Sequence, residues 1–133
     1  TGIYGAQTVR NLAALGEKCR AHGITPIFLT VTPIRPVWMT TRMKIMTPPS
    51  DWMDHRDYIN NWIRQQEFSI DVTSVLADAD GELEAAYTTD GLHPDYVGKK
   101  HIGQTVDAYL RKNFAYAVGA AERRLRIYKE TGE

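Results

Sequence analysis

Two side chains that could move a proton, Asp90 and His93, lie three positions apart in the segment Thr-Thr-Asp-Gly-Leu-His-Pro-Asp at residues 88–95. Gly91 loosens the backbone between them, and Pro94 disfavours helical backbone angles at His93, so the segment is predicted to be a tight loop. In such a loop Asp90 can hold one ring nitrogen of His93 and leave the other free to accept a proton. The pair therefore has the composition of a general base and its orienting carboxylate.

The residue that follows this loop, Asp95, is predicted to cap a helix, because its carboxylate can accept amides that the first helical turn leaves without partners. The same feature supplies a structural alternative for the pair. In that alternative the segment is only a helix-capping turn, and His93 makes a local hydrogen bond without taking part in chemistry.

The segment resembles the last conserved block of the SGNH or GDSL-type hydrolases, in which an Asp-x-x-His pair is followed by Pro, then Asn or Asp, and then Gly. The matching residues are Asp90, His93, Pro94, Asp95 and Gly98. The resemblance extends over about Val9–Asn113, in the order helix, apolar strand, helix, short strand, loop and helix. It implies an α/β fold, a three-layer flavodoxin-like parallel sheet with helices on both faces, of which this chain has only the C-terminal half.

The resemblance also implies a Ser-His-Asp triad to which Asp90 and His93 contribute two members. In that family the nucleophilic serine lies in a Gly-Asp-Ser-type segment after the first strand, and a glycine and an asparagine of the oxyanion hole come from two further blocks. All three blocks precede the matched region, and none occurs in this sequence. None of the serines present lies in a glycine-flanked turn between strand and helix, the setting that exposes a nucleophile: Ser50, Ser69 and Ser74. The serine must therefore come from other residues, or the chain is inactive.

Hydrophobic periodicity predicts a helix and then a strand in the first part of the chain. Apolar residues recur at helical spacing from Ala6 to His22, and Gly23 suits the end of a helix. The segment Ile24–Pro33 is short and rich in β-branched and aromatic residues. Its nearly continuous apolar stretch, Ile27–Val31, predicts a strand that is buried on both faces of a parallel sheet.

Residues 34–50 show no clear periodicity and predict an irregular connection, which is long for a compact domain. The connection leaves the carboxyl end of the predicted strand, where α/β folds bind their ligands. Two interpretations stay open. Trp38, Met39 and Met43 form an apolar wall or lid over an acyl or alkyl group, or the segment is a surface loop that packs its own apolar residues.

Residues 51–66 predict a helix that Ser50 or Asp51 caps, with His55 on its inward face as a packed rather than a catalytic histidine. Three polar residues lie outside that face and are predicted to be solvated: Arg56, Asn60 and Arg64. The next segment, Ser69–Leu76, predicts a short alternating strand, which a turn at residues 77–81 and one helical turn at 82–87 follow. A helix is predicted at Tyr96–Lys112, and a last helix at Phe114–Glu130. The inward residues of the first of these helices are Ile102, Val106, Tyr109 and Leu110.

Two strands are too few for the helices that flank them, because helices on both faces of a parallel sheet need more sheet to cover. On this internal ground too, residues 1–113 are predicted to be the C-terminal part of an α/β domain. Residues 114–133 are predicted to be a helical extension that either covers the same core or packs on another chain, for example in a homo-oligomer through residues 114–130. The N-terminal half of the domain is then an expected partner, in cis or as a separate chain.

Composition excludes several other classes of function. Sixteen basic and sixteen acidic residues cancel, so no strong field favours nucleic acid as a partner. Cys19 is the only cysteine, which excludes an internal disulfide, and we expect no cofactor and no metal. No run of about eighteen apolar residues predicts a transmembrane helix. A lone cysteine slightly favours a cytoplasmic protein but leaves the location open, since any N-terminal signal would lie outside this sequence.

The resemblance implies hydrolysis of an ester, with an acetyl or short acyl group on a sugar, a lipid or another small molecule. Two alternatives belong to other classes. A metal site at Asp90, His93 and His101 is disfavoured, because His101 lies about 12 Å further along the predicted helix. The chain could also be a non-catalytic binding or assembly module derived from half of a hydrolase.

Overall fold

The computed structural model describes residues 3–44 and 47–132, and helices account for most of them. Residues 45 and 46 of the predicted connection lie outside the described residues. The elements follow in the order α1 (Ile3–Ala21), β1 (Phe28–Leu29), α2 (Pro36–Arg42), α3 (Trp52–Arg64), β2 (Ser69–Ile70), α4 (Thr73–Leu76), the 3₁₀ turn η1 (Ala85–Tyr87), α5 (Tyr96–Asn113) and α6 (Ala115–Thr131).

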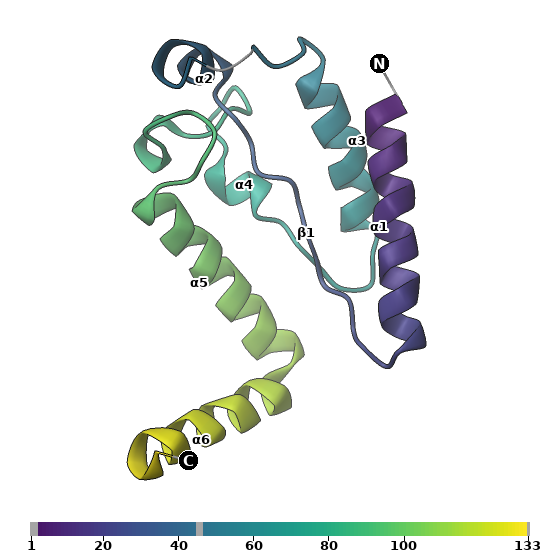
Figure 1. Cartoon of the computed structure of the whole chain (residues 1–133), viewed down its shortest axis with the longest axis vertical. Helices are drawn as coiled ribbons and strands as arrows, with labels where there is room; N and C mark the ends of the chain where they lie inside the picture. Colours follow the sequence, from purple (N-terminus) through teal and green to yellow (C-terminus); the bar gives the residue numbers. More distant parts are fainter. Residues whose placement is uncertain (1–2, 45–46, 133) are drawn as a thin grey trace.

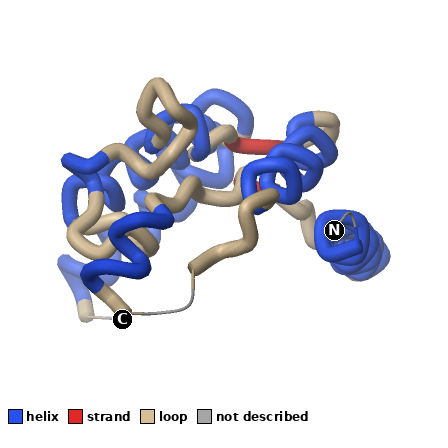
Figure 2. Tube along the Cα trace, turned by 90° about the horizontal axis from the view of Figure 1, so that it is seen from above, coloured by secondary structure: helices blue, strands red, loops and turns tan. Residues whose placement is uncertain are grey.

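The two strands form a parallel pair in which Phe28 lies beside Ser69 and Leu29 beside Ile70. Helices α1 and α3 pack together on one side of the strands, and α4 and α5 lie on the other (Figure 1). Figure 2 shows the same arrangement from above, with the short strands between helices. A parallel pair needs a crossover connection, and α2 and α3 lie within it. The chain is therefore a partial α/β domain, as the strand count predicts.

The predicted strands are correct in place and direction but wrong in extent and burial. The strand predicted over residues 24–33 is regular only at Phe28–Leu29, and Leu29 remains 41% exposed, so burial on both faces is not observed. The strand predicted at Ser69–Leu76 ends at Ile70, and its second half is helix α4. The reason is local, because side chains rather than a neighbouring strand bind the backbone beyond these points, as described below.

The predicted helices are confirmed within a few residues, with two corrections. The connection predicted to be irregular contains α2, which begins at Pro36, a residue whose fixed φ suits the first helical position. Helix α3 has Asp51 at its N-cap position, but no side chain caps it. The Asp51 carboxylate instead lies 3.3 Å from Nε2 of His55, which is half-buried and forms a T-shaped ring contact with Tyr4.

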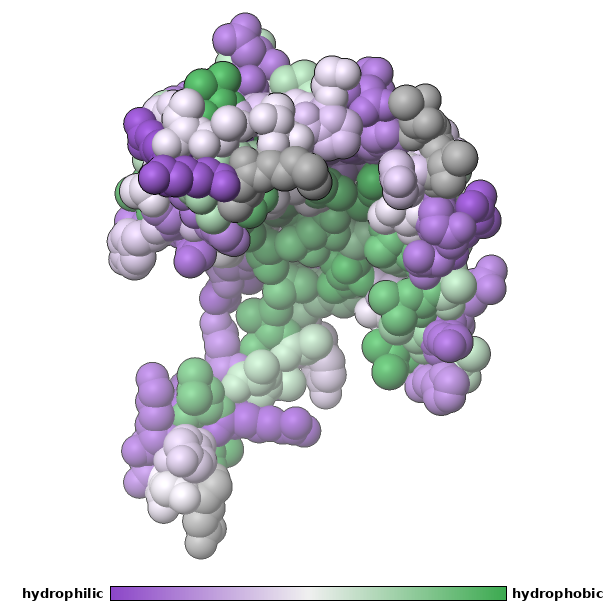
Figure 3. Space-filling model, turned by 45° about the horizontal axis from the view of Figure 1, so that its top comes forward, coloured by the Kyte–Doolittle hydropathy of each residue, from purple (hydrophilic) through white to green (hydrophobic). Residues whose placement is uncertain are grey.

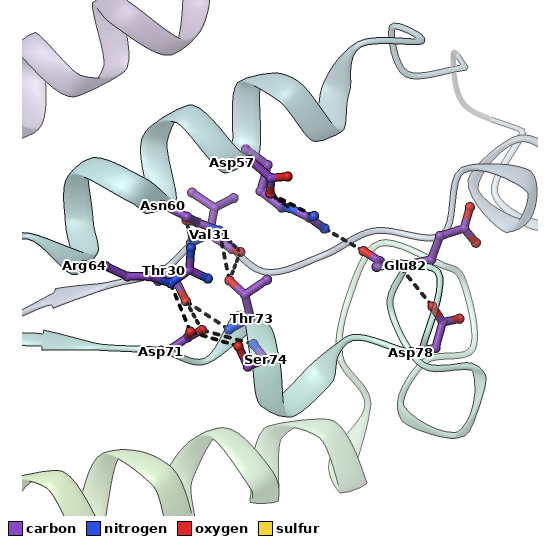
Figure 4. Close-up of polar contacts among 12 residues, drawn as sticks. Thr30, Val31, Asp57, Asn60, Arg64, Asp71, Thr73, Ser74, Asp78 and Glu82 are labelled. Atoms are coloured by element: carbon purple, nitrogen blue, oxygen red, sulfur yellow. Dashed lines mark hydrogen bonds and ion pairs between the residues drawn. The ribbon is translucent and has the colours of Figure 1, made fainter.

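A buried polar cluster binds the two strands to α3 where they diverge (Figure 4). The Asn60 side chain is 0% exposed, accepts the Val31 amide at 2.7 Å and donates to Oγ1 of Thr73 at 3.0 Å. The Thr73 hydroxyl donates to the carbonyl of Val31, and the Thr30 hydroxyl accepts the amides of Val72 and Thr73. These bonds take the place of a longer ladder, since buried backbone groups need partners.

The prediction that Asn60 and Arg56 are solvated is therefore wrong, whereas Arg64 is exposed as predicted. Arg56 is also buried, and its Nη1 donates to the carbonyl of Gly81 at 2.6 Å. Both side chains lie outside the apolar face of α3 and hydrogen-bond backbone groups of other segments. Helical periodicity contains no information about such distant partners.

The described apolar core is small, and most of its side chains come from α3, β2 and α4 or from residues next to them. Its buried side chains are Met39, Ile59, Ile63, Ile70, Val72, Leu76 and Leu83. The inward residues predicted for α5 are only half-buried: Ile102, Val106, Tyr109 and Leu110. Figure 3 shows that apolar side chains gather in a hollow at the centre of one face. Both helical layers thus retain apolar surface that the two strands do not cover.

Helix α6 extends away from the rest of the chain (Figure 1). Phe114, at its start, packs against Phe68 with ring centroids 4.9 Å apart, but Leu125 and Tyr128 on α6 are more than half exposed. The helix is confirmed, although it does not cover the described core, so packing on another chain stays a prediction. Among the described residues no helix is long and apolar enough to span a bilayer.

Replacement of Asn60 by alanine should lower the free energy of unfolding by about 2–3 kcal/mol, because it leaves the part-buried Val31 amide without a partner and removes the buried hydrogen bond to Thr73. Urea unfolding followed by circular dichroism measures this change. The matched control is Asn61→Ala at the exposed neighbouring position, which should change stability by less than about 0.5 kcal/mol. Equal effects of the two substitutions would contradict a structural role for the cluster.

Candidate active site

Asp90 and His93 form a direct pair in the loop that the sequence predicts. Oδ2 of Asp90 lies 2.8 Å from Nδ1 of His93. The histidine side chain is 66% exposed and the aspartate side chain 25% exposed. Among the described residues, Asp90 is the hydrogen-bond partner of the ring, and Nε2 is left without one. A proton acceptor oriented by a carboxylate is thus available at the surface.

The loop holds the Asp90 carboxylate by its own backbone. Oδ1 of Asp90 accepts the amides of Leu92 and His93, each at 2.8 Å. The buried Thr88 hydroxyl accepts the Gly91 amide and donates to the His93 carbonyl, both at 2.9 Å. The carboxylate therefore has a fixed position before any ligand binds. Its hydrogen bond to Nδ1 in turn orients the His93 ring.

These contacts keep Asp90 ionised. The hydrogen bond to the His93 ring and those to the two loop amides hold the pKa of the Asp90 carboxyl well below its ordinary value, against a smaller opposing effect of burial. Asp90 is therefore an anion at neutral pH. An anionic acceptor favours the tautomer in which Nδ1 has the proton and Nε2 is free.

The loop rests on the start of α2, and only glycine fits at the contact. Gly91 has φ of +85°, a left-handed value. A Cβ atom on Gly91 would lie 2.5 Å from the Arg35 carbonyl oxygen and 2.7 Å from Cβ of Trp38. The carbonyl of Gly91 in turn accepts the Arg35 amide at 2.7 Å. The segment after β1 therefore supports the loop that contains the pair.

Arg35 connects the start of α2 to the turn at residues 78–83, which precedes the loop. Its Nε donates to the carbonyl of Leu83 at 2.8 Å, and its guanidinium forms ion pairs with Asp78 and, at 3.2 Å, with Glu82. Sequence reasoning missed this residue. Its partners lie more than forty positions away, and no local pattern marks it.

The predicted helix cap is confirmed beside the pair. The Asp95 carboxylate accepts the amides of Val97 at 2.8 Å and Gly98 at 3.1 Å at the start of α5. A Cβ atom on Gly98 would lie 2.9 Å from the carbonyl oxygen of Tyr87, so this glycine permits close packing of α5 on the turn before the loop.

The three predicted substrate-binding residues lie on or next to α2 but differ in exposure. Met39 is only 7% exposed, and its backbone lies close to Gly91. Trp38 and Met43 are half-buried. The guanidinium carbon of Arg42 lies 3.3 Å from the centroid of the Trp38 ring, and Nη1 of Arg42 donates to the carbonyl of Thr89 in the loop.

The serines and the other histidines lie elsewhere. Ser69 is in β2, the Ser74 hydroxyl donates to Asp71 at 2.9 Å, and Ser50 is exposed before α3. None of the three hydrogen-bonds His93. His101 packs against Tyr87 with ring centroids 4.8 Å apart. Within residues 3–44 and 47–132, no three side chains of the metal-binding types come together.

No protein-family model and no curated protein matches the chain. Among solved structures it is similar to a GDSL-like lipase from Bacteroides thetaiotaomicron, with a TM-score of 0.63 and 20% identity over 81% of this chain and 53% of that chain. A proposed acylhydrolase from Bacteroides fragilis gives a TM-score of 0.63 and 20% identity, over 81% of this chain and 52% of that one. A proposed platelet activating factor from Streptococcus pneumonia gives a TM-score of 0.59 and 21% identity, over 80% and 51% of the two chains.

The chain shares part of its fold with these three solved structures. It spans about half the length of the solved structures it matches. Identity near 20% establishes the likeness of fold alone. A match to only half of each solved structure agrees with the small two-stranded sheet. It also agrees with the apolar surface of the helical layers that the two strands do not cover.

Replacement of Gly91 by alanine should lower the free energy of unfolding by about 2 kcal/mol or more, because the added methyl group meets α2 at a left-handed backbone angle. Gly103→Ala is the matched control. Gly103 lies in α5 with open space around it, so the same substitution should stabilise the chain by about 0.5–1 kcal/mol. Urea unfolding of both variants checks the opposite signs.

Replacement of Asp90 by asparagine should have a pH-dependent cost. Because the pKa of Asp90 is depressed in the folded chain, its carboxylate stabilises the fold above the ordinary aspartate pKa of about 4, and that contribution is lost as pH falls through the folded pKa. Asp90→Asn should thus lower the unfolding free energy by about 1–2 kcal/mol near neutral pH and by less at about pH 3. Urea unfolding at both pH values measures the difference.

The control for this comparison is Asp80→Asn, at an exposed turn residue whose side chain makes no hydrogen bond in the described chain. Its effect should stay below about 0.5 kcal/mol at both pH values. A cost of Asp90→Asn that is the same at the two pH values would show that the carboxylate charge does not stabilise the loop.

Proposed function

We propose that this chain supplies the general base and its orienting carboxylate to a serine-dependent ester hydrolase of the SGNH or GDSL type. The observation that supports the proposal most directly is the Asp90–His93 pair, preassembled at 2.8 Å on an exposed histidine, in a chain that shares part of its fold with a GDSL-like lipase. The complete domain is then a three-layer flavodoxin-like parallel sheet. The nucleophilic serine and the oxyanion donors come from residues outside this chain.

In the proposed reaction Nε2 of His93 accepts the proton of the serine hydroxyl as the serine oxygen attacks the ester carbonyl carbon. Asp90 holds the Nδ1 proton and stabilises the imidazolium that forms. When the tetrahedral intermediate collapses, His93 delivers the proton to the leaving alcohol. Water then attacks the acyl-enzyme, His93 accepts its proton, and that proton returns to the serine.

The position of α2 gives the proposed substrate site one wall. Trp38 and Met43 are half-buried on the segment against which the proposed catalytic loop packs, so they are the accessible members of the predicted apolar wall, whereas Met39 is buried. A wall of this kind suits an acetyl or short acyl group on a sugar, a lipid or another small molecule. Each oxyanion donor supplied by the other residues would contribute about 3–4 kcal/mol to transition-state stabilisation.

A non-catalytic module remains the second candidate, and one observation favours it. None of Ser50, Ser69 and Ser74 hydrogen-bonds His93, so the described chain has a base without a nucleophile. In that case the chain would use the hydrolase fold for binding or assembly, for example through the exposed helix α6.

A fluorophosphonate, which reacts with activated serines, separates these functions. With the serine-bearing polypeptide present, we expect one adduct on that polypeptide and none on residues 1–133, as measured by intact mass. His93→Ala should reduce the labelling rate and ester hydrolysis by about 10³-fold or more, because the serine loses its base.

The matched control is His22→Ala, at an exposed histidine that bonds only the Lys18 carbonyl and should leave both rates unchanged. Labelling of a serine within this chain would overturn the division of the triad between two segments. Absence of an adduct on any polypeptide would favour the non-catalytic module.

A further inference from the structure

One edge of strand β1 has no neighbour in the described chain. The amides of Phe28 and Thr30 donate to the carbonyls of Phe68 and Ile70, each at 3.0 Å, so alternate residues of this segment face β2. Leu29, between them, directs its backbone groups to the opposite edge, and no described residue bonds them there. A strand edge with free amides and carbonyls is a template for another strand.

Apolar side chains gather in a hollow at the centre of one face (Figure 3), and both residues of β1 line a depression beside α1. Two adjoining depressions of about 350 and 510 Å³ share Thr8 of α1 and Val31. The first reaches Trp52 of α3, and the second is lined by Leu12 and Leu29. Leu29 and Val31 are 41% and 40% exposed, so the strand itself offers apolar side chains to the hollow.

The opposite helical layer also has unburied apolar surface. On α5, Ile102, Val106 and Tyr109 are half-buried although they lie on its inward side. Because β1 runs between α1 and α5, a segment placed beside β1 would have helices above and below it (Figure 1). Such a segment would be buried on both faces, which requires a nearly continuous apolar sequence.

We propose that the free edge of β1, with the hollow beside it, binds one extended strand of the polypeptide that supplies the nucleophilic serine. This inference rests on the proposed function. The occupant is a strand rather than a helix, because only an extended backbone can bond the free groups of Leu29. It runs parallel to β1, so that its carboxyl end and the loop after it reach the edge where the Asp90–His93 loop lies.

Amide hydrogen exchange tests the surface without relying on activity. The Leu29 amide is compared in this chain alone and in this chain joined to, or mixed with, the fluorophosphonate-reactive polypeptide. We expect its exchange to slow by about 100-fold or more in the second sample, as an open edge becomes a paired strand. The Phe28 amide, already bonded to Phe68, is the internal reference and should be protected in both samples.

A pair of matched substitutions tests the hollow. Leu29→Lys places a charge in the hollow that the added strand would cover, and should weaken association by about 100-fold. Because Leu29 is 41% exposed, the chain itself should stay folded. Leu125→Lys makes the same change at a 53% exposed position on α6 and should leave association unchanged. Circular dichroism of each variant checks that the chain is folded.

The outcomes separate this inference from the proposed function. Ester hydrolysis with a Leu29 amide that still exchanges rapidly would overturn the docking surface and leave the function intact. A protected Leu29 amide without ester hydrolysis would support the surface and overturn the function. Protection that grows with the concentration of this chain alone would assign the edge to a second copy and overturn the proposal.

Discussion

The arrangement of this chain depends on how two short strands part. After the hydrogen bond from the Thr30 amide to the Ile70 carbonyl, the backbones of β1 and β2 no longer pair, and the amides and carbonyls that follow need other partners. Asn60 and the hydroxyls of Thr30 and Thr73 supply them. Because an unpaired buried group costs about 1–3 kcal/mol, this cluster fixes both where the strands end and where the segments after them begin. Those segments form the loops of the candidate site.

From that junction, one connected set of contacts leads to His93. The segment after β1 contains Arg35, whose side chain binds the turn after α4 and whose amide binds Gly91. Gly91 lies between Asp90 and His93, so both chain segments converge on the loop with the pair. The geometry of the Asp90–His93 pair is thus held by backbone contacts within the loop and by α2 outside it. This arrangement suits the proposed base, which must be in place before substrate arrives.

Features that depend on neighbouring residues could be predicted from the sequence, and features that depend on distant ones could not. The Asp90–His93 pair, the Asp95 cap and the turn at Gly91 use residues within a few positions of each other, and the structure has all of them. Asn60 and Arg35 escaped prediction because their partners are 13 to 48 positions away and their types suit a solvated surface. The exposure of Leu29 is a second kind of failure. Its apolar sequence predicts a strand buried on both faces, but no described strand covers the outer edge of β1, and Leu29 is 41% exposed.

This contrast bears on how the proposed hydrolase would divide its chemistry between segments. The Asp–His pair is encoded within four residues and closed by local hydrogen bonds, so it forms in a chain that has about half of the fold. In the proposed hydrolase, the distance from the serine to Nε2 of His93 would have no such local basis, because it would depend on the register between strands of different segments. A base preassembled by its own loop needs only one further constraint, the placement of the nucleophile. The free edge of β1 is suited to supply that constraint, since a strand paired there has its register fixed relative to the loops that hold His93.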